Sequence, residues 1–261
     1  MKNNRALDGF ENERDFVKTL NKNKLHPYWN ILNLNHNNNN HFFIRVEGKK
    51  LSKLTNEKIL PKSDVYVEIV DIEEDDLIEN DYYLDEKSTK NIKKKISKTG
   101  ISIKMENTNY QIDKCSVNKF IKRYDSKELF CGATIYSRNI DDFNKNNLVL
   151  KYANTTWKEF ATFFNQDFLK DIEEATVFTE KHKKIFSLIQ KNSYNKIKSL
   201  TLENEENLNS LFKGEIEFEE PYCANWLLIN GTLTTEVPKE FYVTKGSSNG
   251  GKNPTVVFKP I

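Results

Sequence analysis

The stretch PKSDVYVEIVDI, residues 61–72, has the alternating pattern of a β-strand that begins after a proline. Its branched apolar residues recur at every second position, so they would share one face of the strand. Asp64 begins the opposite face, which also carries Tyr66 and Glu68. The pattern therefore predicts a strand whose polar face starts with an aspartate.

A second stretch, GISIKM at residues 100–105, alternates in the same way. Its isoleucines and methionine would face the core, which leaves Ser102 and Lys104 on the other side. If this strand lies near the first, Asp64, Ser102 and Lys104 come to one polar edge.

A third stretch, DGFENERDFVKTLNK at residues 8–22, predicts an amphipathic helix with Asp8 as a possible N-cap. Glu13 projects from the middle of its apolar face, whereas Glu11 points away. A carboxylate among core residues is costly unless it is paired. Glu13 therefore either leans out to water at the helix end, or binds or supports a metal ion.

A helix glutamate, a strand aspartate and a strand lysine suit metal-dependent hydrolysis of phosphodiesters. Mg²⁺ takes oxygen ligands and keeps several waters, so one or two carboxylates, a backbone carbonyl and a phosphate oxygen suffice. The metal lowers the pKa of a water and neutralises phosphate charge. A nearby lysine can orient or deprotonate that water, or stabilise the charged transition state.

PKSDVYV and GISIKM together resemble the PD-(D/E)xK nuclease superfamily, especially type II restriction endonucleases, and GFENERDFVKTLN resembles their N-terminal helix. The resemblance covers residues 8–124. It implies an α/β fold with a restriction-endonuclease-like core, in which helices flank a central mixed β-sheet. Ser102 departs from the family pattern, which usually has Asp or Glu there. Some restriction enzymes similarly carry S-x-K and recruit an acid from elsewhere.

The resemblance also implies a set of site residues, with Mg²⁺ as the cofactor. The catalytic residues would be Asp64, Lys104, Glu13 and Ser102. The metal ligands would be Asp64, Glu13 and the backbone carbonyl of Ile103. Three further acids stand in reserve as metal ligands: Glu11, Glu68 and Glu106. Glu68 lies four residues beyond Asp64 along the strand, roughly 13 Å away, which weakens it as a ligand of the same ion.

The charge of the chain is balanced overall but unevenly distributed. The formal net charge is +2, yet residues 68–86 hold ten acids and no base, and residues 87–98 hold six lysines and no acid. The pattern fits a solvated hairpin whose opposite charges face each other. It also fits a basic segment that follows a phosphate backbone.

Contacts to DNA would come from polar side chains in the C-terminal part of the chain. The tail TKGSSNGGKNPTVVFKP, beginning at residue 244, combines glycines with donors that suit phosphates or bases, although an ordinary flexible loop has the same composition. The candidate DNA-binding residues are Lys245, Ser247, Ser248, Asn249, Lys252, Gln111 and Arg138.

No Pro-, Gly- or Ser-rich linker divides the chain, so we expect one endonuclease domain over residues 1–261. Residues 1–135 would form the catalytic core. Residues 136–261 would add a helical segment and C-terminal strands for DNA recognition and dimerisation. Helices are expected at 155–174, 179–200 and 203–213.

Several function classes are disfavoured by composition. No apolar run approaches the ~20 residues of a membrane span, and the first residues lack a signal-peptide core, so we expect a cytoplasmic protein. Cys115, Cys131 and Cys223 have no metal-binding spacing and predict buried free thiols. The four histidines form no zinc-hydrolase motif.

The leading hypothesis is a Mg²⁺-dependent, sequence-specific endonuclease that cuts double-stranded DNA with metal-activated water. By resemblance to restriction enzymes, a homodimer would act on a twofold-symmetric site. The alternatives are a structure-specific or repair nuclease of the same fold, and a non-catalytic module that binds DNA or another protein.

Overall fold

The computed structural model describes residues 5–34, 39–104, 111–124, 126–146, 151, 153–172, 175–248 and 253–261. The chain folds into two compact units, each made from two separate stretches. The first unit contains residues 1–110 and 209–237, and the second contains residues 111–208 and 238–261. A single endonuclease domain stays a prediction, since it is a statement about function as well as about folding.

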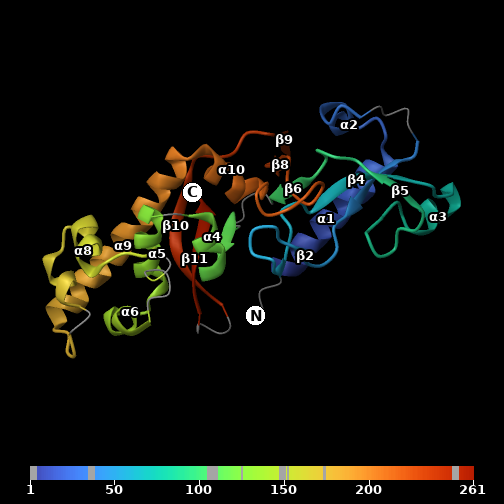
Figure 1. Ribbon diagram of the computed structural model, residues 1–261. Coiled ribbons are helices and arrows are strands. Elements are labelled where there is room, and N and C mark those ends of the chain that lie inside the picture. The colour runs from blue at the N-terminus through green and yellow to red at the C-terminus, as the bar shows by residue number, and fades with distance from the viewer. Residues whose placement is uncertain are drawn as a thin grey trace. The chain divides into compact units, whose positions relative to one another are not determined.

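A mixed β-sheet forms the centre of the first unit (Figure 1). Its strand order is β1–β4–β6–β8–β9, and β5 also pairs with β4. The strands are β1 (His41–Arg45), β4 (Val65–Val70), β5 (Ile92–Lys95), β6 (Ile101–Lys104), β8 (Trp226–Ile229) and β9 (Thr232–Thr234). β6 and β8 are parallel, whereas the other neighbours are antiparallel. The expected α/β class, with a central mixed sheet flanked by helices, is confirmed.

Helix α1 (Arg5–Lys22) covers one face of this sheet with its apolar side. Val17 and Leu20 are buried, and Phe16 packs against the same cluster. The residues of the sheet and of the short helix α2 (Pro27–Ile31) that complete this core include Trp29, Phe43, Val65, Val67 and Ile101. Of the predicted apolar faces, Val65, Val67 and Ile101 are buried in this core and Ile103 packs against it, whereas Met105 lies outside the described residues.

The predicted N-cap of α1 is wrong. The helix begins at Arg5, so Asp8 lies inside it. Arg, Ala and Leu at residues 5–7 are all strong helix formers, and they extend the helix beyond the acidic start that the pattern indicated.

The other face of β4 is also covered, which the sequence pattern did not predict. Tyr66 and Glu68 are fully buried, so this face is not an open polar edge beyond Asp64. Tyr222 packs edge-on against Tyr66, with their ring centroids 5.9 Å apart. Helix α3 (Glu74–Glu79) brings Leu77 to a second apolar cluster on β1 and β4.

The acidic and basic runs at residues 68–98 face each other at a few positions, as the hairpin interpretation predicted, but Glu68 is buried and not solvated. β4 pairs with β5 so that Glu68 lies opposite Lys95. Lys93 on β5 forms an ion pair with Asp71 at 3.0 Å. The alternative interpretation, a basic segment that follows phosphates, stays a prediction.

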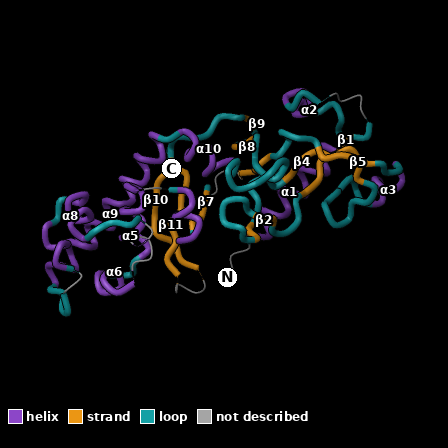
Figure 2. The backbone as a smooth tube through the Cα atoms, viewed as in Figure 1, coloured by secondary structure: helices purple, strands orange, loops and turns teal. Residues whose placement is uncertain are grey.

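The second unit combines helices with a small antiparallel sheet, in which the long strands β10 and β11 lie side by side (Figure 2). The sheet contains β10 (Phe241–Ser248), β11 (Asn253–Pro260) and β7 (Asp113–Cys115). The helices are α4 (Val117–Arg123), α5 (Ser126–Tyr136), α6 (Ile140–Asn146), α8 (Trp157–Phe164), α9 (Glu180–Glu203) and α10 (Glu205–Lys213), of which α10 runs into the first unit. A short 3₁₀ helix follows α8 at Asp167–Asp171, and β2 (Lys50–Leu51) and β3 (Lys58–Ile59) form a ribbon in the first unit.

The helix expected at residues 155–174 is divided in two. Asn165 ends α8 in the left-handed conformation, with φ 54°. Asparagine tolerates this conformation better than most residues, so it stops the helix although the apolar pattern continues.

All three cysteines are free and buried, as predicted. Within the described residues, no helix is long and apolar enough to cross a membrane.

Gly100, which precedes β6, has no room for a side chain. A Cβ there would lie 2.6 Å from the carbonyl oxygen of Pro221 and closer still to that of Cys223. Backbone atoms cannot yield cheaply, so we expect Gly100→Ala to lower the free energy of unfolding by about 1–3 kcal/mol. Thermal unfolding followed by circular dichroism measures this change.

Gly9→Ala is the matched control, because a Cβ at Gly9 meets nothing within 4 Å inside helix α1. It should stabilise the protein slightly, by about 0.5–1 kcal/mol. Equal melting temperatures for the two variants would contradict the expected clash.

Candidate active site

Asp64 stands immediately before β4 and is fixed on both sides by backbone hydrogen bonds. Its N–H donates to the carbonyl of Ile101 at 2.8 Å, and its own carbonyl accepts from the N–H of Val46 at 2.9 Å. Its carboxylate accepts from the N–H of Ile103 at 2.7 Å and from the hydroxyl of Ser102 at 3.3 Å. The predicted meeting of Asp64 with the SIK segment is therefore present in the structure.

The backbone of Ile103 faces the same side as the Asp64 carboxylate. β4 and β6 are paired at Val65 and Ile101, and farther along β4 its partner is β5. The N–H and C=O of one strand residue point to the same side, and this side recurs at every second residue. The carbonyl of Ile103 thus points, like its N–H, to the side where Asp64 lies.

Glu13 reaches the sheet from α1 through Arg45 on β1. The Nε of Arg45 donates to Glu13 Oε2 at 2.7 Å, and its Nη1 also bonds Glu47. Glu13 is half-buried, which agrees with its predicted position on the core side of the helix. Our sequence reasoning missed Arg45, although an arginine inside the apolar run FFIRV was a signal of a buried acidic partner.

The charges of these groups act on one another. Burial raises the pKa of Asp64, while the Lys104 charge and the Ile103 N–H oppose this change. Burial and then the negative charge of Asp64 raise the pKa of Glu13, while Arg45 and Lys104 oppose this change. Asp64, Glu13 and Lys104 therefore influence one another electrostatically, and the effect of burial on the two carboxylates outweighs the stabilising charges of Lys104 and Arg45.

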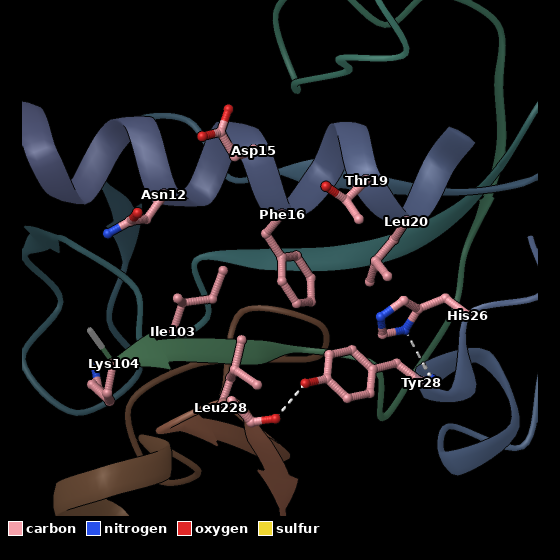
Figure 3. A pocket seen from close by; sticks show the side chains of 11 residues that line it. Asn12, Asp15, Phe16, Thr19, Leu20, His26, Tyr28, Ile103, Lys104 and Leu228 are labelled. Carbon is pink, nitrogen blue, oxygen red and sulfur yellow. Dashed lines mark hydrogen bonds between the residues drawn. The ribbon is translucent and has the colours of Figure 1, made fainter. Parts of the chain in front are cut away.

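A groove of about 530 Å³ adjoins Lys104 between α1 and the sheet. Figure 3 shows Phe16 from the helix and Ile103 from β6 pointing into this space, with Lys104 at one end. Tyr28 lies at the other end and donates from its hydroxyl to the carbonyl of Gly231 at 2.6 Å. Lys104, which we predicted from the sequence to be catalytic, therefore lies at the end of this groove.

The residues present fit a magnesium ion by the chemistry of their donors. Asp64, Glu13 and the Ile103 carbonyl would hold it, since Mg²⁺ needs few protein oxygens and keeps its waters. A nearby cation would also favour the charged forms of the two carboxylates, whose pKa values are raised. In the described part of the chain, no group of three or more His, Cys, Asp or Glu is arranged to hold a metal ion.

The reserve acids lie elsewhere or outside the described residues. Glu11 is exposed on α1. Glu68 is buried and accepts from the hydroxyl of Tyr66 at 2.6 Å, in a cluster that includes Glu86 and Lys95. Glu106 lies outside the described residues. Glu13 is thus the acid that the structure brings into electrostatic contact with Asp64.

The residues predicted to contact DNA belong to the second unit. Gln111 and Arg138 are exposed, and Arg138 pairs with Asp142 at 2.9 Å. Lys245 is exposed on β10 and donates to the carbonyl of Ser137 at 3.3 Å. Burial lowers the pKa of Lys245. Ser247 and Ser248 end β10, whereas Asn249 and Lys252 lie outside the described residues.

No family model, curated protein or solved structure matches this chain.

Proposed function

We propose that this protein is a Mg²⁺-dependent endonuclease that cuts double-stranded DNA, with a core like that of restriction endonucleases. One observation carries the proposal: the Asp64 carboxylate binds the Ile103 N–H at 2.7 Å, directly before Lys104 in the same strand. This arrangement joins the two stretches that resemble the PD-(D/E)xK superfamily. Glu13 supplies the second carboxylate that Ser102 does not provide.

Each residue then has a specific task in hydrolysis. When bound, Mg²⁺ supplies positive charge at the phosphate and makes water there more acidic. Lys104 orients the attacking water and stabilises the charge that develops on the phosphate oxygens. The Ser102 hydroxyl and the Ile103 N–H hold the Asp64 carboxylate in a fixed orientation. The new P–O bond forms from water, and the bond to the leaving ester oxygen breaks as that oxygen takes a proton.

We further propose sequence specificity and a twofold dimer, as in type II restriction–modification systems that act in the cytoplasm. A homodimer places two such sites on opposite strands of a twofold-symmetric sequence. The resemblance of the SDVYV and SIK stretches supports this part of the proposal.

Digestion of a sequenced plasmid with Mg²⁺, followed by run-off sequencing of the ends, tests the function. Fixed fragments with one common end sequence are expected, and a chelator should abolish them. A smear would instead indicate a structure-specific or non-specific nuclease of the same fold. Intact plasmid at all Mg²⁺ concentrations would contradict a nuclease.

Glu13→Gln tests the helix acid. We expect the Mg²⁺ concentration for half-maximal cleavage to rise by roughly 10–100-fold or more. Loss of a group that supports a metal site typically lowers metal affinity by this factor. Glu11→Gln on the same helix is the matched control, because that side chain is exposed. Equal metal dependence in both variants would exclude Glu13 as a ligand.

A further inference from the structure

Helix α9 of the second unit carries a long run of positive charge. Residues 181–202 contain six lysines and no Asp or Glu, whereas the whole chain has a net charge of +2. The lysines are Lys181, Lys183, Lys184, Lys191, Lys196 and Lys198. Glu180, before this run, pairs with Lys183 at 2.8 Å.

The packing of α9 fixes which side of the helix faces water. One side packs on α5 and β10. Its buried residues follow the helical period and are Phe186, Ile189, Ser193, Ile197 and Thr201. The opposite side exposes Lys184, Lys191, Asn195 and Ser199, and Lys196 is exposed on the flank of the helix, beside Phe163 of α8. These five residues form the exposed surface here called the α9 face.

A hollow of about 510 Å³ lies at the C-terminal part of the α9 face. It is lined by Phe163, Asn195, Lys196, Ser199 and Leu200. The ammonium of Lys196 lies 4.3 Å from the ring centroid of Phe163, which holds the lysine beside the hollow. An ammonium, an amide and a hydroxyl are the donors that proteins use for phosphate and sugar oxygens.

The length of the α9 face suits a nucleic-acid strand. A rise of 1.5 Å per residue separates Lys184 from Lys196 by about 18 Å, the length of roughly five base pairs of duplex. A membrane-surface helix would need a free apolar side. On α9 that side is buried against α5 and β10.

We propose that the α9 face binds the sugar–phosphate backbone of DNA, with a phosphate in the hollow beside Lys196. This contact is separate from the residues proposed to cleave DNA, and it holds whether or not the protein is a nuclease.

The experiment measures DNA binding without cleavage. Fluorescence anisotropy of the full chain on a labelled 30-base-pair duplex in EDTA gives Kd at several salt concentrations. We compare the triple variant Lys184→Gln, Lys191→Gln, Lys196→Gln with the triple control Lys49→Gln, Lys58→Gln, Lys239→Gln. All six lysines are exposed, and each triple variant loses three positive charges. Circular dichroism checks that both variants are folded.

We expect the α9 variant to bind at least tenfold more weakly than the control at about 100 mM salt. Its slope of log K against log salt should become shallower by roughly 2–3, since each phosphate contact contributes about 0.9. Equal Kd values and slopes in the two variants would overturn the proposal, as would a lack of DNA binding by the unmodified chain. Loss of binding only to phosphatidylserine vesicles would also overturn it, in favour of a lipid surface.

The same measurements separate this proposal from the nuclease proposal. If the chain binds DNA through α9 but leaves plasmid intact with Mg²⁺, the α9 contact stands and the nuclease proposal fails. If the chain cleaves plasmid and the α9 variant binds like the control, the opposite holds.

Discussion

Lys104→Ala should lower the rate of DNA cleavage by roughly 10²–10⁴-fold, the range for loss of a group that transfers a proton or stabilises developing charge. The affinity for DNA should change little, because a single lysine contributes one phosphate contact at most. Single-turnover cleavage at saturating Mg²⁺, together with Kd in EDTA, separates the two effects.

The reason for this expectation is the position of Lys104 relative to the two carboxylates. Its charge lowers the pKa of both Asp64 and Glu13, although burial still raises each of them overall. Lys58→Ala, on the exposed surface of β3, is the matched control and should cleave at the normal rate. If Lys104→Ala also cleaves normally, the lysine has no part in catalysis.

Asp64→Asn should abolish cleavage and at the same time stabilise the metal-free protein. Burial raises the pKa of Asp64. An acid with a raised folded-state pKa gives stability that is full below its unfolded pKa and is lost as pH rises through the folded pKa. An asparagine oxygen can still accept from the Ile103 N–H, but it carries no charge at neutral pH.

The difference in melting temperature between Asp64→Asn and the unmodified protein should therefore grow as pH rises from about 4 to 7. A gain of about 1 kcal/mol corresponds to roughly 2–4 °C for a chain of this size. Addition of Mg²⁺ should stabilise the unmodified protein and have no such effect on the variant. A variant that melts lower than the unmodified protein at pH 7 in EDTA would contradict the expected electrostatic cost.

The sequence predicted those parts of the site that depend on local periodicity. The alternation around Val65 and Ile101 placed Asp64, Ser102 and Lys104 correctly with respect to the core, since a strand allows only two faces. The helical period likewise identified Glu13 as a core-side acid. These predictions succeed because each needs only neighbouring residues.

Other features depend on contacts between distant residues and could not be predicted from such patterns. The parallel pairing of β6 with β8 joins Ile101 to Trp226, and nothing within either strand encodes that partner. Tyr66 looks like a solvent-facing residue, but Tyr222 comes from far along the chain to pack against it. The basic side of α9 was visible in the sequence, yet its outward orientation required the packing of Phe186 and Ile197.

The first unit is built from two separate stretches, residues 1–110 and 209–237. This division affects the order in which its strands are synthesised. On the ribosome β6 is synthesised more than a hundred residues before β8, its parallel partner. Until then the edge of β6 that β8 later occupies offers unpaired backbone groups to any other strand. Most of the second unit emerges during this interval. The first unit is therefore completed only after most of the second unit has been synthesised. Chains released before residue 237 should be those most prone to aggregate.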